Sequence, residues 1–132
     1  MNESAENYIK TIYVLKKKLK SVRSIDIAKA MGFSRASVSA AMANLKRKEL
    51  ITIKNNGAIE FTGQGERIAG DIYERHATLS GFLMYVAGVD EKTAKEDACR
   101  IEHFISPSTL EGIKKFVKGH LKDELPVIPG ES

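Results

Sequence analysis

The apolar residues of this sequence recur mainly at intervals of three and four positions, a spacing that predicts amphipathic helices. The first such stretch covers residues 4 to about 19. A longer stretch follows Thr62, a residue type that can cap a helix, and runs to about residue 87. Asp90 can cap the next helix, and Ser106-Pro107 ends that helix and starts another. The chain is therefore predicted to be mainly helical.

Two shorter helices between these stretches form a helix-turn-helix pattern. The first is expected over residues 24–31 with Ser24 as its cap, and the second over residues 35 to about 49 with Ser34 as its cap. Gly32 interrupts the pattern between them, where a tight turn needs glycine's freedom. The combination is typical of a DNA-binding helix-turn-helix, and a generic helical hairpin is the alternative.

Alternating apolar and polar residues then predict two short strands, over residues 51–54 and 58–61. They flank Asn55-Asn56-Gly57, and Asn-Gly is a strong hairpin signal. A hairpin directly after a helix-turn-helix makes a winged helix. We therefore expect a mainly α protein, with an N-terminal winged helix-turn-helix domain over residues 1–63 and a helical domain over residues 64–132. The tail from about residue 120 is expected to be loosely ordered.

The charge is distributed unevenly around a net value of +4. Residues 1–62 contain 12 Lys and Arg against 5 Asp and Glu, whereas residues 63–132 contain 9 against 12. A basic N-terminal half favours a nucleic-acid partner, although a lysine-rich solvated surface would give the same count. The residues expected to contact double-stranded DNA lie early on the second helix-turn-helix helix, at its end or on the wing: Ser34, Arg35, Ala36, Ser37, Ser39, Ala40, Arg47, Lys54 and Asn56.

Most of these side chains are small, which predicts close approach to the bases but few bidentate base contacts. Arg35, Lys46 and Arg47 are better suited to phosphate groups. Turn chemistry alone accounts for Asn56 and Gly57, so only the position of the wing argues that they contact DNA.

Composition indicates where the protein works. Its single cysteine cannot form an internal disulfide and fits a reducing cytoplasm. No apolar run approaches the ~18 residues of a membrane span, and the N-terminus does not read as a signal peptide. We therefore expect a cytoplasmic protein that has no membrane partner.

Cys99, Glu102 and His103 form the most chemically informative group. Spacings of three and four place them on one face of a helix. A thiolate, a carboxylate and an imidazole together suit Fe, Zn, Ni or Co better than Mg or Ca. A half-buried cysteine beside two solvated side chains is the alternative. His76, on the apolar stripe of the long helix, is either a core histidine or a fourth ligand.

Three ligands with an open position also occur in catalytic zinc sites, which raises the possibility of an enzyme. The sequence shows no separate general base near the ligand motif, no nucleophile motif and no glycine loop that would cradle phosphate. We therefore expect neither an enzymatic activity nor a small-molecule substrate.

Several segments, in this order, resemble the diphtheria toxin repressor and manganese transport regulator family of metal-dependent repressors. They are Glu6-Asn7-Tyr8-Ile9-Lys10-Thr11-Ile12-Tyr13, Ile25-Asp26-Ile27-Ala28, Ser34-Arg35-Ala36-Ser37-Val38, Thr62-Gly63-Gln64-Gly65, Arg75-His76 and Ala98-Cys99-Arg100-Ile101-Glu102-His103. The similarity covers about residues 5–118, and its last segment is the most specific. It implies a homodimeric repressor of metal-homeostasis genes that binds a near-palindromic operator. The implied corepressor is a divalent transition metal, Fe²⁺ or Mn²⁺ first, with Zn, Co or Ni as further possibilities. Apolar residues in excess of one small core are candidates for the dimer interface: Phe82, Leu83, Tyr85, Val86 and Phe104.

The resemblance also implies a ligand set. Cys99, Glu102 and His103 match ligand positions of the family, and Asn7 or His76 would complete the site. Cys99 stands where the iron-sensing branch has Cys and the manganese branch has Glu. The chain nevertheless looks like the short manganese branch, because it ends without the C-terminal barrel domain of the iron-sensing members.

Three positions depart from the family pattern. Asn7 replaces a Met or Asp, Lys10 stands where the manganese branch has a ligand Glu, and Ser80 stands where the iron-sensing branch has one. These departures favour one metal site over two. In place of a metal, the Lys10 ammonium could pair with Glu102. The departures leave open a winged-helix regulator whose metal site is degenerate and which binds DNA constitutively.

Overall fold

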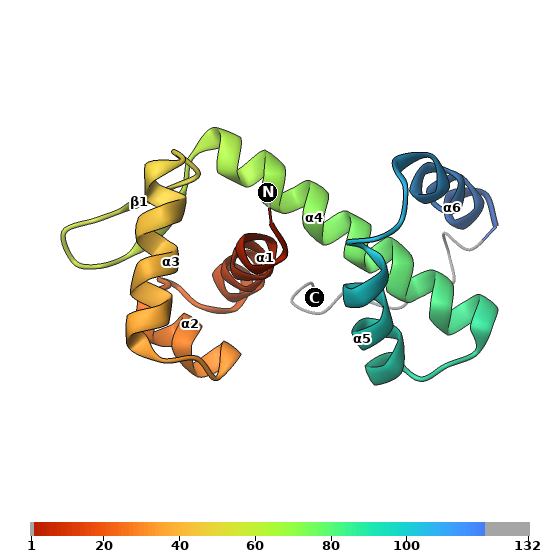
Figure 1. Cartoon of the computed structure of the whole chain (residues 1–132), viewed down its shortest axis with the longest axis horizontal. Coiled ribbons are helices and arrows are strands. Elements are labelled where there is room, and N and C mark those ends of the chain that lie inside the picture. The colour runs from red at the N-terminus through yellow and green to blue at the C-terminus, as the bar shows by residue number, and fades with distance from the viewer. Residues whose placement is uncertain (1, 121–132) are drawn as a thin grey trace. The chain divides into compact units, whose positions relative to one another are not determined.

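The computed structural model describes residues 2–120, which are mostly helical (Figure 1). The elements in chain order are α1 (Glu3–Lys18), α2 (Ser24–Met31), α3 (Arg35–Arg47), β1 (Ile51–Ile53), β2 (Ile59–Phe61), α4 (Gly63–Phe82), the π-helix η1 (Leu83–Ala87), α5 (Glu91–Ile101) and α6 (Pro107–His120). The chain divides into two compact units, one up to Ile72 and the other beginning at Tyr73. The predicted fold class, mainly α with an N-terminal winged helix, is confirmed. The expectation for the tail concerns residues 121–132, which lie outside the described residues.

The first unit is built on α1, α2 and α3, which share one core with the wing. Each helix buries one apolar stripe, because its apolar residues recur at helical spacing. The core residues of this unit are Ala5, Tyr8, Ile9, Ile12, Val22, Ile27, Ala28, Val38, Met42, Leu45, Leu50, Ile51, Ile59, Ala69 and Ile72. Ala41 of α3 is partly buried and packs against this core.

Caps define the two helices of the helix-turn-helix. Ser34 caps α3 as predicted, because its Oγ accepts a hydrogen bond from the Ser37 N–H at 3.1 Å. The predicted cap of α2 is wrong: Ser24 is already helical, and Arg23 is the N-cap residue. The Asp26 carboxylate accepts from the Arg23 backbone N–H at 2.9 Å, which moves the start of the helix. Gly32, at φ +69, makes the turn between the helices.

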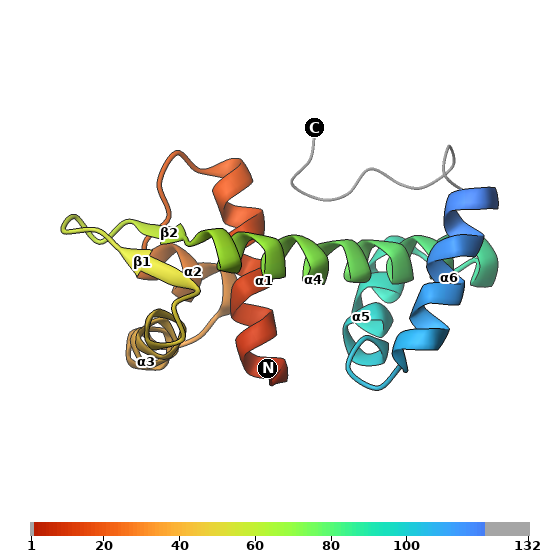
Figure 2. The ribbon, with the colours of Figure 1, turned by 90° about the horizontal axis from the view of Figure 1, so that it is seen from above.

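The wing is an antiparallel pair in which Ile51 lies opposite Phe61 and Ile53 opposite Ile59. In Figure 2 its loop extends away from the helices of the first unit. Asn56 shapes the turn, because its Oδ1 accepts from the Ala58 N–H at 3.0 Å. The outer edge of β2 is also paired: the Ile59 N–H donates to the Val22 carbonyl at 2.8 Å. The α1–α2 connection therefore supports the wing.

The start of α4 is fixed against the start of the wing. Thr62 caps the helix as predicted, because its Oγ1 accepts from the Gly65 N–H at 3.0 Å, and its hydroxyl donates to the Glu49 carbonyl at 2.7 Å. Gly65 lies directly on the backbone of Leu50, where a Cβ would stand 1.9 Å from the carbonyl oxygen. Only glycine fits this contact.

In the second unit, α5 and α6 lie beside the C-terminal part of α4 (Figures 1 and 2). The long helix reaches residue 87 as predicted, but its last five residues form the π-helix η1. The wider i→i+5 turn changes the side-chain register. Val86, one of the residues predicted at the dimer interface, is 52% exposed. The rings of Phe82 and Phe116 pack edge to face at 6.1 Å between centroids. Within residues 2–120, no helix combines the length and the apolar character needed to cross a membrane.

Candidate metal centre and DNA-binding surface

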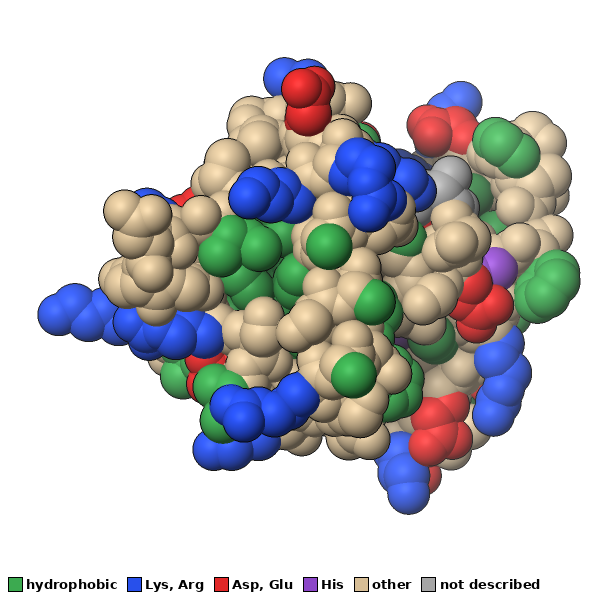
Figure 3. Space-filling model, turned by 60° about the vertical axis from the view of Figure 1, so that its left-hand side comes forward, with side chains coloured by type: hydrophobic (Ala, Val, Ile, Leu, Met, Phe, Trp, Pro, Cys, Tyr) green, Lys and Arg blue, Asp and Glu red, His purple; other side chains and the backbone are tan. Residues whose placement is uncertain are grey.

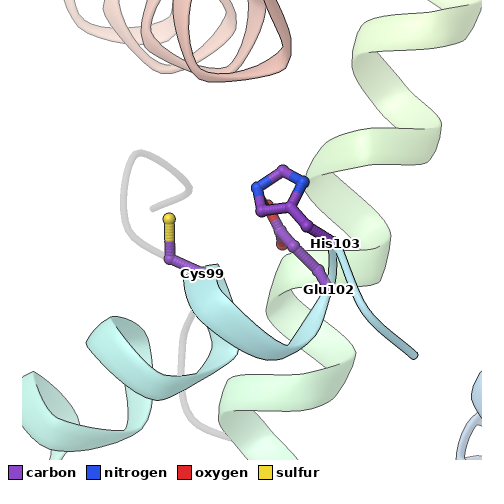
Figure 4. A group of neighbouring side chains, drawn as sticks. All are labelled: Cys99, Glu102 and His103. Carbon is purple, nitrogen blue, oxygen red and sulfur yellow. Dashed lines mark ion pairs between the residues drawn. The ribbon is translucent and has the colours of Figure 1, made fainter. Parts of the chain in front are cut away.

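The predicted ligands Cys99, Glu102 and His103 lie together at the end of α5. One donor atom from each residue, a sulfur, a carboxylate oxygen and an imidazole nitrogen, can be chosen so that all lie within 4.8 Å of one another. Figure 4 shows Cys99 on the last turn of α5 and the other two on the turn that follows. A single metal ion is therefore within reach of all three donors.

The local sequence explains this position. Ala94 and Ala98 are fully buried, so α5 packs closely along one face, and Asp90 caps its first turn through the Thr93 N–H at 2.7 Å. The prediction that all three residues lie on one helix is wrong in detail. The helix α5 ends at Ile101, so Glu102 and His103 follow its last residue. The N–H groups of Phe104 and Ile105 both donate to the Ile101 carbonyl, which tightens the chain into a turn.

Glu102 lies between two imidazoles. Its Oε2 is 3.3 Å from Nδ1 of His76 on α4, and its Oε1 is 3.5 Å from Nε2 of His103. The Glu102 side chain is fully buried, and the His76 side chain is 19% exposed. Burial of a carboxylate costs free energy unless a cation or hydrogen-bond donors compensate it. Through its contact with Glu102, His76 of α4 lies next to the predicted cluster of Cys99, Glu102 and His103.

The donor set fits a divalent transition metal. The His76 Nδ1 atom is buried, and no group in residues 2–120 forms a hydrogen bond with it. A buried nitrogen next to a carboxylate oxygen is the arrangement that a shared cation would complete. Thiolate, carboxylate and imidazole donors are a borderline-soft set, which favours Fe, Zn, Co or Ni and accepts Mn.

Ser80, which stands where the iron-sensing branch has a ligand Glu, forms a hydrogen bond within α4. Its side chain is nearly buried and its hydroxyl donates to the His76 carbonyl at 3.1 Å, one turn back along α4. The hydroxyl therefore bonds to the backbone of the helix that carries His76. Asn7 and Lys10 lie on α1 in the first unit, and both are half-buried. Their roles at the metal centre stay predictions.

The predicted DNA-binding residues share one property, which is exposure. All seven predicted positions on or next to α3 are exposed: Ser34, Arg35, Ala36, Ser37, Ser39, Ala40 and Arg47. Ser34 and Ser37 are tied together by a hydroxyl–hydroxyl bond of 2.9 Å, and Arg47 donates to the Asn44 side chain at 3.3 Å. Figure 3 shows Lys and Arg side chains in several groups over the face that carries the first unit. The surface suits a polyanion.

On the wing, Lys54 is exposed and forms an ion pair with Glu60 at 3.8 Å. Glu60 also accepts a hydrogen bond from Lys16, whose ammonium donates to the Ile59 carbonyl as well. The Lys16 hydrogen bond lowers the pKa of Glu60 below its ordinary value. Asn56 accepts hydrogen bonds from the Ala58 N–H through Oδ1 and from Arg23 through its backbone carbonyl. This predicted DNA contact therefore has a structural role.

Sequence interpretation missed Arg23 and Lys16, which brace the wing. Arg23 Nε donates to the Asn56 carbonyl at 2.9 Å, and Lys16 reaches β2 from the end of α1. Both contacts join residues far apart in the chain. No sequence spacing signals them, because neither pair shares a helix or a hairpin.

Two family models match the chain in sequence. The iron dependent repressor, N-terminal DNA binding domain, matches residues 1–59, and the iron dependent repressor, metal binding and dimerisation domain, matches residues 62–124. An uncharacterized HTH-type transcriptional regulator of Methanocaldococcus jannaschii is 31% identical over 119 residues, which are 89% of this chain and 95% of that protein. The transcriptional regulator MntR of Escherichia coli O6:H1 is 30% identical over 118 residues, 89% of this chain and 76% of that protein.

Solved structures agree with these matches. The manganese regulator SloR superposes with a TM-score of 0.75 at 26% identity, covering 86% of this chain and 53% of that chain. T. acidophilum IdeR, at 22% identity and a TM-score of 0.76, shares the fold over 96% of this chain and 61% of its own. The chain thus spans about half the length of SloR. The two family models and the 30–31% identical regulators point to the same family as the motifs do. The chain therefore belongs to the iron-dependent repressors, that is, to the diphtheria toxin repressor and manganese transport regulator family.

Proposed function

We propose that this protein is a metal-dependent transcriptional repressor that binds a near-palindromic operator as a homodimer and controls metal-homeostasis genes. Its corepressor is a divalent transition metal, Fe²⁺ or Mn²⁺ first, with Zn, Co or Ni also accepted by the donor set. Residues 1–63 bind DNA, and residues 64–132 bind the metal and dimerise. The protein acts in the cytoplasm and is not an enzyme.

One observation carries this proposal: a cluster of three metal donors within 4.8 Å lies in the same chain as an exposed, basic winged helix. Neither feature alone indicates regulation. A metal cluster without a DNA-binding surface would suit an enzyme or a structural site, and a winged helix without a cluster would bind DNA constitutively. Their combination in one chain favours metal-controlled DNA binding.

At the metal centre, Cys99 would bind as a thiolate and His76 and His103 as neutral imidazoles, with Glu102 contributing a negative charge. A bound divalent ion supplies a fixed double positive charge that holds its ligands in one arrangement. Because Cys99 must lose a proton and the imidazoles must stay neutral, metal affinity falls as the solution becomes more acidic. Asn7 remains a further candidate ligand, through its side-chain oxygen.

The homodimer is proposed on the apolar surface of the second unit. Phe104 is 86% exposed, Val86 52% and Tyr85 45%, and an interface between two subunits would bury these apolar side chains. Phe82 and Leu83, the other predicted interface residues, are partly buried within the unit. A two-fold dimer would present two α3 helices to successive major grooves, about 34–36 Å apart. Sedimentation of a monomer at micromolar concentration would contradict this proposal.

The test is operator binding with and without metal. An operator is first selected from a random-sequence duplex library with Mn²⁺- or Fe²⁺-loaded protein, and its affinity is then measured by fluorescence anisotropy. We expect tight binding with metal and a loss of at least tenfold with chelator. Cys99→Ala, which removes one donor, should weaken the metal response, whereas Ser108→Ala, an exposed position on α6, is the matched control. Chelator-independent binding would refute the corepressor role.

A degenerate metal site is the second candidate, and Lys10 is the observation that favours it. This position holds an ammonium where the resemblance places a ligand carboxylate in the manganese branch. A regulator of this kind would bind the selected operator equally well with chelator and would show no calorimetric metal binding. The same experiment therefore separates the two functions.

A further inference from the structure

Arg23, in the connection between α1 and α2, holds the turn of the wing from outside the hairpin. Its Nε–H donates to the Asn56 carbonyl at 2.9 Å, across 33 positions of sequence. Its side-chain Cδ lies 3.8 Å from the place where a Cβ on Gly57 would stand, so the aliphatic stem runs along the turn. The guanidinium is thereby placed at the tip of the wing.

The backbone of Arg23 also forms hydrogen bonds, through both its N–H and its carbonyl. Its N–H donates to the Asp26 carboxylate at 2.9 Å, and its carbonyl accepts from the Asp26 N–H at 3.0 Å. The preceding carbonyl, of Val22, pairs with the Ile59 N–H of β2 at 2.8 Å. Arg23 is therefore anchored to α2 and to the wing at the same time, and little conformational freedom remains to be lost on binding.

The charge of Arg23 is not neutralised by any carboxylate in the described part of the chain. The side chain is exposed, and within residues 2–120 no carboxylate forms an ion pair with its guanidinium. Two other cations near the wing, Lys16 of α1 and Lys54, differ in this respect, because both pair with Glu60. Nε donates to the wing turn, and no group in residues 2–120 accepts from the two Nη groups. These Nη groups can donate to a ligand, and paired N–H donors in one plane match a phosphate group.

We propose that Arg23 is a DNA-binding residue: anchored to the wing turn through Nε, it binds a backbone phosphate through its Nη groups beside the wing. This inference rests on the proposed DNA-binding function and adds a contact from outside the helix-turn-helix and the hairpin. Phosphate contacts of this kind fix the register of the protein on the duplex and carry no base preference. Arg23 thus orients the wing and takes part in the contact.

The test uses the salt dependence of binding to a mixed-sequence DNA duplex long enough for two successive major grooves, with metal-loaded full-length protein. Each neutralised phosphate contributes about 0.9 to the slope of log K against log salt. Arg23→Gln should lower the slope by about 0.9 per subunit. Arg23→Lys, which keeps the charge but loses the planar guanidinium, should bind more weakly with a slope close to wild type. Lys115→Gln removes a charge from an exposed position on α6 and should leave the slope unchanged.

The outcomes separate the hypotheses. A wild-type slope for Arg23→Gln would overturn the phosphate contact, and weaker binding at that slope would make Arg23 only a brace of the wing. Failure of the wild-type protein to bind any duplex would instead refute the proposed function itself. If Arg23→Gln does not fold, the guanidinium NMR signals of Arg23 in the wild-type protein give the answer. They should shift on addition of the duplex, and unchanged signals would overturn the proposal.

Discussion

Replacing Gly65 with alanine tests how the wing is joined to the long helix. Gly65 lies in the first turn of α4, where alanine ordinarily improves helix stability. Here the added methyl group would meet the Leu50 backbone, at 1.9 Å from the carbonyl oxygen and 2.8 Å from the carbonyl carbon. The tertiary contact and the helix propensity therefore predict opposite effects, and their magnitudes decide the sign.

The methyl group must move about 1.1 Å from the Leu50 oxygen, the difference between 1.9 Å and the 3.0 Å below which real Cβ atoms essentially never approach. Leu50 is 3% exposed, and its carbonyl accepts from the Thr62 N–H at 3.1 Å. Overpacking of this kind costs about 1–3 kcal/mol, and loss of the hydrogen bond about 0.5–1.5 kcal/mol. Against this, alanine gains about 1 kcal/mol over glycine in a helix. The expected net destabilisation is about 2 kcal/mol, within roughly 0.5–3.5 kcal/mol.

Urea unfolding, followed by circular dichroism at one fixed protein concentration, measures the difference. Gly63→Ala is the matched control, because it adds the same methyl group in the same turn of α4 and nothing lies within 4 Å of it. We expect Gly63→Ala to match or exceed the wild-type midpoint and Gly65→Ala to fall well below it, with equal slopes. Equal midpoints for the two variants would refute the reasoning, since they would mean that Leu50 does not restrict this position.

Three further changes test the metal centre and the wing. Cys99→Glu should raise the response to Mn²⁺ relative to Fe²⁺, Co²⁺ or Zn²⁺, because carboxylate prefers harder ions than thiolate does; unchanged metal preference in operator binding would argue against Cys99 as a ligand. Lys10→Glu should make operator binding more strictly metal-dependent, as measured by calorimetry and anisotropy, and identical stoichiometry and apo affinity would make Lys10 a surface residue. The hydrogen bond from Lys16 lowers the folded-state pKa of Glu60, so this pair stabilises the fold above the ordinary pKa of glutamate and the contribution disappears as pH falls through the lowered value. Glu60→Gln should therefore reduce the unfolding free energy near neutral pH by less than about 1 kcal/mol, because the pair is partly exposed. The reduction should become progressively smaller in acid. A difference in unfolding free energy between variant and wild type that does not change with pH would contradict this assignment.

Local rules were sufficient for most of the elements. Apolar spacing located the helices, and side-chain caps at Ser34, Thr62 and Asp90 located three of their starts. These rules work because helix caps and hairpin turns are made by residues a few positions apart. They failed at Ser24, where the competing Asp26 carboxylate bonds to the Arg23 N–H and makes Arg23 the cap.

The sequence by itself also determined the donor types of the metal centre and the basic character of the first unit, since both follow from residue identity. Only the tertiary structure placed His76 within 3.3 Å of Glu102, buried that carboxylate completely and moved His103 beyond the end of α5. It alone connected Arg23 to the wing turn and Gly65 to Leu50. Each of these contacts joins separate elements, and their geometry depends on how whole helices and strands pack, which no short spacing in the chain encodes.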